Sequence, residues 1–382
     1  MQNRRYVLIT IMILTLMISL FASPPVTMAI TKVTPTPEPQ SADELDIEAL
    51  LERAIEKVNE EDYQGAIDDL TAVIQRDETV WDAYFFRAFS YSQSGDQNRA
   101  IDDYTRALII LPHDWTTYAL RGDLYLLTED LVQADIDYEQ SIYLNPRYAP
   151  AYAGKALLSL AQGDETLGSI YQAIYQALQA SVSGDSDANI DILSDAIDNM
   201  DAPSTPAELG YVYYNRSNTY IGLKNWDNAL SDISNAIDLQ PDMQDYYMAR
   251  GFVYSETDQL DLAAPDFYKR MTLVETTSID ETIDFGKATT VEMDYGTVAR
   301  LTFTGEAGQR VTLTARDSEG MGVDPLLVLL DSEGNPIAGN DDGGGEYDSM
   351  IGDFELLADG SYTAVVSHAN GGFVGTVTVS LK

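Results

Sequence analysis

The sequence has 382 residues, with 22 basic and 62 acidic side chains that give a formal net charge of −40. Apolar residues make up 45% of the chain and aromatic residues 10%, which indicates a folded protein with more than one domain. A field of this sign repels phosphate backbones, so the composition excludes nucleic acid as a partner. High net charge keeps an exported protein soluble, and it also favours a basic protein surface or bound cations as partners.

The sequence lacks the residues on which many catalytic sites depend. Cysteine is absent, and histidine occurs only as His113 and His368. Disulfides, thiol nucleophiles, histidine-based triads and multi-histidine metal sites are therefore excluded. The chain also contains no GxSxG, P-loop or GxGxxG motif. We expect a protein that is not an enzyme and needs no organic cofactor.

Residues 1–29 have the pattern of a secretory signal peptide. Arg4 and Arg5 precede an apolar run at residues 6–22, and small residues follow up to Ala29. We expect cleavage near Ala29, which would leave the protein secreted or in the cell envelope. If the segment is retained, its apolar run is just long enough to tether the chain to a membrane.

A proline-rich linker and a long repetitive region follow. Residues 30–45 contain three prolines and no apolar periodicity, which predicts a solvated spacer. Over residues 46–275 an alanine recurs at a spacing of 34 residues, interrupted once. Self-similarity at that period predicts an array of helix–turn–helix units, because no single unit can bury its own apolar face. The recurring alanines are Ala66, Ala100, Ala134, Ala229 and Ala263.

Small and large residues recur in step with these alanines. A small residue stands twelve positions before each alanine and a large one four positions after it. Helical spacing lets them interlock between neighbouring helices. The pattern resembles the tetratricopeptide repeat family over residues 46–275, and the resemblance implies an all-α solenoid. It is carried by Ala54, Ala88, Gly122, Ser217, Gly251, Leu70, Tyr104, Tyr138, Ile233, Phe267, Pro112, Pro146 and Pro241.

Each of five repeats also carries one arginine and one aspartate at fixed positions. The arginine stands thirteen residues before the alanine and the aspartate three residues after it. In an antiparallel helix pair these positions lie at the same level, so we expect ion pairs within each unit or to the preceding one. Such pairs fix geometry more reliably than they add stability. The expected pairs are Arg53–Asp69, Arg87–Asp103, Arg121–Asp137, Arg216–Asp232 and Arg250–Asp266.

The fourth repeat departs from this pattern. Lys155 stands at the position of the arginine, Gly168 at that of the alanine and Tyr171 at that of the aspartate. Residues 184–206 then add an extra helix and a proline-rich loop, so we expect a degenerate or inserted region at residues 165–206. Two interpretations remain open, namely drift in a tolerant repeat and a bend that shapes a binding surface.

Residues 278–382 alternate apolar and polar side chains between turn sequences, which predicts an antiparallel β-sandwich. The segment resembles the bacterial pre-peptidase C-terminal domain. The resemblance implies a jelly-roll-like fold, a place in secreted bacterial proteins and no catalytic residues of its own. The predicted fold is therefore multidomain, with a helical array before a sandwich. The matching residues are Asp324, Pro325, Asp331, Gly334, Asn340, Asp341, Asp342, Gly360, Tyr362 and Gly375.

Acidic turns of this segment form a candidate calcium site. Calcium takes six to eight oxygen ligands, which carboxylates, amides and carbonyl groups supply. Relatives of the domain in collagenases bind calcium, so the resemblance makes a structural calcium ion the one cofactor to consider. The alternative is that these acids are solvated turn residues. The candidate ligands are Asp324, Asn340, Asp341, Asp342 and Asp348.

The concave face expected for the array is the candidate partner-binding surface. Aromatic side chains there would anchor a protein or peptide partner, because they lose little conformational entropy on binding. The alternative is that several of them belong to the core between repeats. The candidate residues are Phe85, Phe86, Phe89, Leu126, Tyr214, Asn218 and Phe252.

These observations predict an exported, non-catalytic scaffold that binds a protein or peptide on the helical array. The alternative function is cell-surface adhesion, or carbohydrate or matrix binding, through the β-sandwich. Fold resemblance alone does not separate the two.

Overall fold

The computed structural model divides the chain into two compact units, which we call unit 1 (up to Gly184) and unit 2 (from Asp185). The expected signal peptide at residues 1–29 and nearly all of the linker at residues 30–45 lie outside the described residues. Within the described part, no helix combines the length and apolar character that a membrane span requires. The described residues are 45–199, 206–318, 323–341, 348–369 and 375–382.

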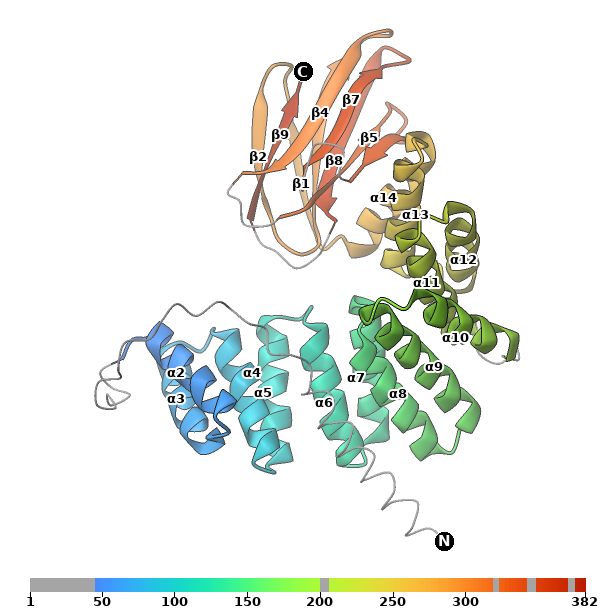
Figure 1. Ribbon diagram of the computed structural model, residues 1–382. Helices are drawn as coiled ribbons and strands as arrows, with labels where there is room; N and C mark the ends of the chain where they lie inside the picture. The colour runs from blue at the N-terminus through green and yellow to red at the C-terminus, as the bar shows by residue number, and fades with distance from the viewer. Residues whose placement is uncertain (1–44, 200–205, 319–322, 342–347, 370–374) are drawn as a thin grey trace. The chain divides into compact units, whose positions relative to one another are not determined.

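The described part of unit 1, from residue 45 on, is built from four helical hairpins (Figure 1). We call the first helix of each hairpin its A helix and the second its B helix. The A helices are α2 (Ile47–Asn59), α4 (Trp81–Gln93), α6 (Trp115–Leu127) and α8 (Ala149–Gln162). The B helices are α3 (Tyr63–Arg76), α5 (Gln97–Ile110), α7 (Leu131–Leu144) and α9 (Glu165–Val182).

Each B helix of unit 1 begins at an aspartate cap, and the caps are 34 residues apart. The carboxylate accepts a hydrogen bond, 2.9–3.3 Å long, from the backbone N–H three residues further on. This bond satisfies one of the free N–H groups at the helix start and contributes about 1 kcal/mol. The local sequence therefore fixes where each hairpin turns. The caps are Asp62, Asp96, Asp130 and Asp164.

Small residues let a large side chain pass between adjacent A helices. A Cβ added at Gly122 of α6 would lie 3.0 Å from the ring of Tyr138, and one at Gly154 of α8 would lie 2.3 Å from it. The fully buried Tyr138 of α7 therefore fills the space between α6 and α8. This interlocking is the packing that the recurrent small and large residues predict.

Unit 2 begins with a single helix and two further hairpins. Helix α10 packs against α11, in the place that a B helix of a preceding hairpin would take. The degenerate region expected at residues 165–206 thus contains the long helix α9, which ends unit 1, and α10, which begins unit 2. The helices are α10 (Ser186–Asn199), α11 (Pro206–Gly222), α12 (Trp226–Leu239), α13 (Gln244–Glu256) and α14 (Leu260–Val274).

The strands of unit 2 form two packed sheets. One has the order β1-β3-β8-β5-β6 and the other β2-β9-β4-β7. Every pair is antiparallel except β1 with β3, which is parallel and differs from the purely antiparallel sandwich expected. The strands are β1 (Thr277–Thr282), β2 (Ala288–Met293), β3 (Thr297–Gly305), β4 (Arg310–Asp317), β5 (Pro325–Leu330), β6 (Pro336–Asn340), β7 (Ser349–Glu355), β8 (Gly360–His368) and β9 (Gly375–Leu381).

Side chains that alternate along these strands fill the space between the sheets. Leu301, Phe303, Leu313 and Val366 all belong to this buried cluster. The alternation of apolar and polar residues that predicts a half-buried strand is therefore satisfied in three dimensions. The predicted fold class, an all-α array followed by a β-sandwich, is confirmed.

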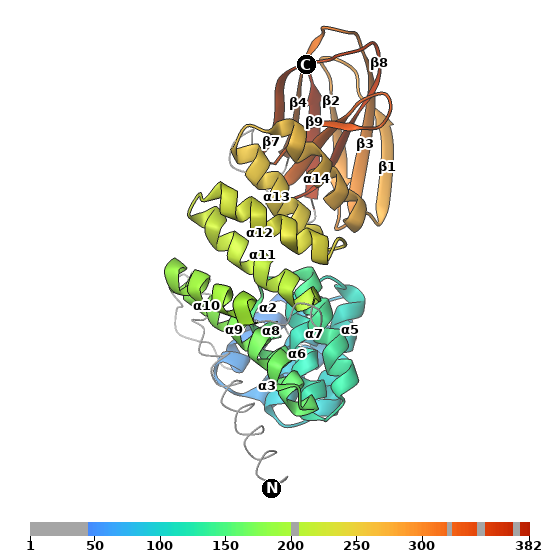
Figure 2. The same cartoon turned by 90° about the vertical axis from the view of Figure 1, so that its right-hand side faces the viewer.

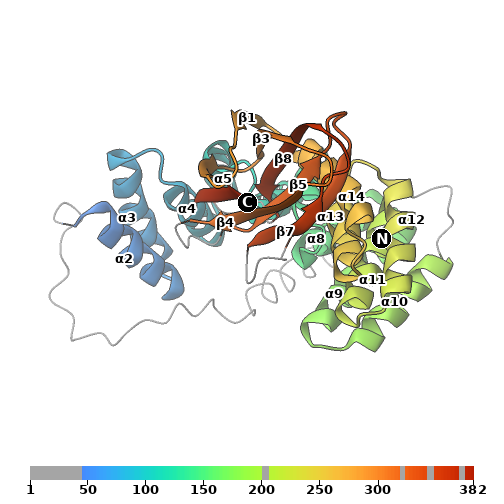
Figure 3. The same ribbon diagram turned by 90° about the horizontal axis from the view of Figure 1, so that it is seen from above.

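Helix α14 covers the outer face of the five-stranded sheet (Figures 2 and 3). Its Ala264 and Phe267 belong to one buried cluster with Leu326 and Val328 of β5. At the end of the helix, the buried Arg270 donates hydrogen bonds from Nη1 to the carbonyl of His368 and from Nη2 to that of Ala369, the latter 2.8 Å long. The last hairpin and the sandwich thus share one core.

Replacing Gly339 of β6 tests how closely α14 approaches the sheet. An added Cβ would lie 2.9 Å from Cα of Ala264, which is backbone and cannot rotate away. We expect Gly339→Ala to lower the free energy of unfolding by about 1–3 kcal/mol, because the helix must move. Gly352→Ala in β7, whose Cβ would meet nothing nearer than 3.6 Å, is the control. Equal stability of the two variants in urea titrations would contradict this packing.

Candidate functional site

Every arginine of the repeated motif binds the aspartate sixteen residues later, in its own hairpin. Nε and Nη2 both donate to the carboxylate, at 2.6–2.8 Å in all five pairs. The aspartates are buried and the arginines largely so. The sequence left open whether each arginine pairs within its own hairpin or with the preceding one. In the structure every pair lies within one hairpin. The pairs are Arg53–Asp69, Arg87–Asp103, Arg121–Asp137, Arg216–Asp232 and Arg250–Asp266.

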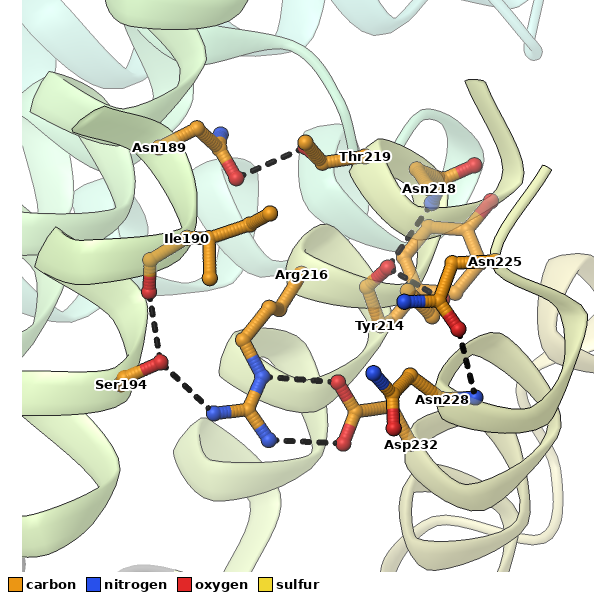
Figure 4. A network of polar contacts seen from close by, with 11 residues as sticks. Asn189, Ile190, Ser194, Tyr214, Arg216, Asn218, Thr219, Asn225, Asn228 and Asp232 are labelled. Carbon is orange, nitrogen blue, oxygen red and sulfur yellow. Dashed lines mark hydrogen bonds and ion pairs between the residues drawn. The ribbon is translucent and has the colours of Figure 1, made fainter. Parts of the chain in front are cut away.

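Three of these arginines also reach the helix that precedes their hairpin. Nη1 of Arg87 donates to Oγ1 of Thr71 at 3.1 Å, and Nη1 of Arg121 donates to Oγ1 of Thr105 at 3.0 Å. Figure 4 shows the equivalent contact in unit 2, where Nη1 of Arg216 donates to Oγ of Ser194 on α10 at 2.9 Å. Each of these guanidinium groups therefore joins three helices.

Tyrosine rings flank the guanidinium groups along the A helices. The rings of Tyr118 and Tyr125 have centroids 5.7 and 5.8 Å from Cζ of Arg121. Arg87 and Arg216 have the same arrangement, with tyrosines three residues before and four residues after the arginine. A cation gains more from an aromatic face when water is excluded, so the rings favour the buried charge.

The fourth hairpin keeps a buried cation but changes its partners. Nζ of Lys155 bonds to Asp135 at 2.7 Å and to Glu139 at 2.5 Å, both on the preceding helix α7. Tyr171, which stands where the other hairpins have aspartate, places its ring centroid 5.1 Å from Nζ. The lost aspartate is thus replaced by two carboxylates on a different helix.

A double-mutant cycle on Arg216 and Asp232 tests whether the pair acts as a unit. Each alanine variant should lose about 3–5 kcal/mol of stability, because it leaves one buried charge behind. The double variant should lose less than the sum, with a coupling of about 0.5–3 kcal/mol in urea unfolding. The control pair, Asp284 and Lys287, is 70% exposed at both side chains and should show no measurable coupling. Additive losses at Arg216 and Asp232 would contradict the contact.

Opposite the ion pairs, the A helices of unit 1 present a second surface. Residues two positions before or after each arginine lie about 200° around the helix from it. We call this surface the A-face and define it by Ile55, Phe89, Asp123 and Leu157, which follow Arg53, Arg87, Arg121 and Lys155 by two residues. Ile55, Phe89 and Asp123 are half-buried, whereas Leu157 is only 6% exposed and packs in the core. Helix α2 contacts α4 and α6 contacts α8, so neighbouring A helices lie side by side.

The structure separates the expected partner-binding residues of unit 1 into two groups. Phe89 is half-buried, and its ring lies 6.3 Å from that of Tyr63. Phe85 packs against the core cluster of its own hairpin, and Phe86 packs against the core cluster of the first hairpin. Leu126 is only 6% exposed and belongs to the core. Leu126 is therefore a packing residue rather than a presented anchor.

The expected partner-binding residues of unit 2 also divide. Tyr214 is only 6% exposed, because its ring lies 4.8 Å from that of Tyr246 in the next hairpin. Nδ2 of Asn218 donates to the backbone carbonyl of Tyr214 at 2.9 Å (Figure 4). Phe252 is half-buried. Tyr214 thus belongs to the core between hairpins, which corrects its assignment as a surface residue.

Sequence reasoning missed Asp123, the one acidic residue among the four that define the A-face. Its carboxylate is half-buried and accepts a 2.6 Å hydrogen bond from Oη of Tyr138. Burial raises the pKa of Asp123 to about 7, against the lowering effect of that hydrogen bond. The sequence signal for Asp123 is that it is acidic at a repeat position where the other three hairpins have the apolar residues Ile55, Phe89 and Leu157.

The pH dependence of stability tests the environment of Asp123. A raised pKa means that the folded state holds the proton more tightly, so this contribution is complete below about pH 4 and is lost as pH rises through 7. Relative to Asp123→Asn, the wild type should therefore lose more than about 1 kcal/mol of unfolding free energy over that range. Burial raises the pKa values of the nearby Tyr104, Tyr138 and Tyr148, so these phenols stay protonated. Parallel stability curves in urea titrations would contradict the assignment.

The five candidate calcium ligands do not form a metal centre within the described residues. No group of three or more histidine, aspartate or glutamate side chains suited to a metal occurs there, and Asp342 lies outside the described part. Asp348 forms a 3.2 Å ion pair with Arg316. Asp324 and Asp341 are buried and lie close enough to Arg270 to raise its pKa, although burial lowers that pKa overall. Asn340 makes a long contact to Ser255. Calcium binding stays a prediction.

Comparison with known families identifies two of the helical hairpins by sequence. The sequence model described as tetratricopeptide repeat matches residues 116–148 and 210–243. A probable subtilase-type serine protease of Deinococcus radiodurans is 40% identical over 93 residues, which are 23% of this chain and 12% of that protein. The chain thus spans about an eighth of the length of this curated relative.

Solved structures resemble each part of the chain separately. A tetratricopeptide repeat protein from Parabacteroides merdae is 19% identical, with 59% of this chain and 93% of that one covered and a TM-score of 0.32. The pre-peptidase C-terminal domain of a collagenase from Bacillus anthracis is 15% identical, with 28% of this chain and 99% of that one covered and a TM-score of 0.24. The chain contains tetratricopeptide repeats, followed by a β-sandwich similar to a pre-peptidase C-terminal domain.

Proposed function

We propose that the chain is an exported, non-catalytic scaffold that binds another protein or a peptide on the A-face of its helical array. The observation that carries this proposal is that the two sides of each A helix have different roles. One side is occupied by the ion pairs that join the helices, whereas the opposite side presents half-buried residues such as Ile55 and Phe89. Tetratricopeptide repeats commonly bind protein partners, which supports this use of the surface.

Export is the second part of the proposal. It is supported by the signal-peptide pattern of residues 1–29 and by the resemblance of the C-terminal domain to one found in secreted bacterial proteins. The proposal places the folded part in the cell envelope or outside the cell. The high negative charge suits this setting, because it keeps an exported chain soluble.

The absence of catalysis is the third part. The sequence offers no cysteine, only two histidines and none of the nucleophile or phosphate-binding motifs considered above. One of those histidines, His368, is buried, and burial lowers its pKa. The strongest charged constellations of the described residues are the arginine–aspartate pairs, whose geometry serves helix packing.

Affinity capture with matched variants tests the scaffold function. The full chain should retain a partner from its own cell envelope, and Phe89→Ala should weaken that retention about tenfold or more, as loss of an aromatic anchor does. Ile109→Ala is the control, since Ile109 is 67% exposed on α5 and lies outside the A-face. If Phe89→Ala retains the same partner as the wild type, or the chain retains only polysaccharide, the scaffold function is wrong.

A further inference from the structure

The four A helices of unit 1 carry basic residues on one side only, whereas acidic residues occur on both, with Glu56 three residues after Arg53 on the side of the ion pairs. Their basic residues all lie on the side of the ion pairs, where each contacts a carboxylate of a B helix or of the preceding helix. These residues are Arg53, Lys57, Arg87, Arg121 and Lys155. On the opposite side the helices carry Glu48 and Asp82, five residues before an arginine, and Asp123, two residues after one.

The neighbours of Asp123 on this surface are apolar. Phe89 of α4, which is half-buried, and Leu157 of α8, which is only 6% exposed and packs in the core, occupy the equivalent positions on the adjacent A helices. Leu127 and Leu160, one turn further along α6 and α8, are each 39% exposed although they are large apolar residues. A carboxylate therefore stands within a partly exposed apolar surface, at the centre of the row of A helices.

The carboxylate of Asp123 is held in place by a neutral donor. Oη of Tyr138 reaches it because the ring passes between Gly122 and Gly154, where any larger residue would collide with it. A phenol hydrogen bond does not neutralise the charge, and burying a carboxylate without a cation is costly. A cation delivered to this position would gain a charge-assisted hydrogen bond to the carboxylate.

We propose that the A-face of unit 1 binds a peptide segment in which a lysine or arginine side chain stands between apolar residues, with Asp123 as the acceptor of the cation. This inference rests on the proposed function and names the chemistry of its partner. The apolar residues of the segment bury Phe89 and the exposed leucines, and the cation meets Asp123. Asp82, on the same surface of α4, extends the match to a second basic residue.

Other occupants fit this surface less well. A purely apolar segment would cover Asp123 without supplying a charge, so the carboxylate would lose water and have to take up a proton, which opposes binding above its pKa. An acidic segment, or the carboxylate at a peptide terminus, needs cations, and the described A helices of unit 1 place all of theirs on the other side. Charge complementarity therefore selects a basic apolar segment.

Fluorescence anisotropy with designed peptides tests the inference on the full chain. The probe is a labelled twelve-residue peptide in which leucine and lysine alternate, and the matched peptides carry glutamine or glutamate in place of lysine. At pH 8, above the raised pKa of Asp123, the lysine peptide should bind, and Asp123→Asn should weaken its binding about tenfold. Asp102→Asn, which removes an exposed carboxylate of α5, is the control for net charge and should change the affinity less than about twofold.

The outcomes separate this inference from the scaffold function. Equal weakening by Asp123→Asn and Asp102→Asn would show that the overall field alone attracts the peptide, and would overturn the inference. So would unchanged binding by Asp123→Asn, or equal binding of the glutamine peptide. If the partner captured from the envelope is lost with Phe89→Ala but kept with Asp123→Asn, the scaffold function holds and the inference is wrong. If Phe89→Ala keeps that partner, the scaffold function itself fails, whatever the peptides show.

Discussion

The bidentate bond between an arginine of one helix and an aspartate of the next is the contact on which the helical array depends. It holds the two helices of a hairpin at one level, and the third nitrogen of Arg87, Arg121 and Arg216 extends the bond to the preceding helix. Both groups lose water to form it, so the pair defines geometry more than it adds net stability. These bonds thus fix the spacing between neighbouring hairpins, and this spacing sets the positions of the side chains on their surfaces.

The fourth hairpin shows what this arrangement requires. Tyr171 stands where the other hairpins have aspartate, so the B helix offers no bidentate partner. Lys155 is nevertheless buried and bonded to two acidic residues of α7. The requirement is therefore a compensated cation at this level of the helix, and the partner can change. Since all the cations are used in this way, the opposite surface of the A helices is left with apolar and acidic side chains. The use of the cations in helix packing on one side of each A helix thus determines which side chains are present for partner binding on the other side.

The sequence predicts the repeats and the ion pairs because both follow from exact spacing, and the helical period then places complementary charges at one level. It does not predict which residues are exposed. Leu126 and Tyr214 occupy suitable positions on their helices, but neighbouring residues cover them, and the Tyr246 that covers Tyr214 lies in another hairpin. Asp123 escaped notice because it departs from a pattern instead of repeating one. The local sequence around Asp324 and Asp341 does not show the cation near them, because Arg270 comes from a helix more than fifty residues earlier.

Arg270 also explains why the array can end where it does. In four of the other hairpins the equivalent position of the B helix holds Val73, Ala107, Ser141 or Ala236, short side chains that let helices pack closely, and the fourth hairpin holds Tyr175. In the described residues that follow α14 the chain forms strands, and the five-stranded sheet covers the apolar face of α14 through Leu326, Val328 and Gly339. A short residue at position 270 could not reach the carbonyl groups at the end of β8, whereas arginine does. The change of secondary structure near residue 275 is therefore not a division between independent cores, and the sandwich completes the repeat that precedes it.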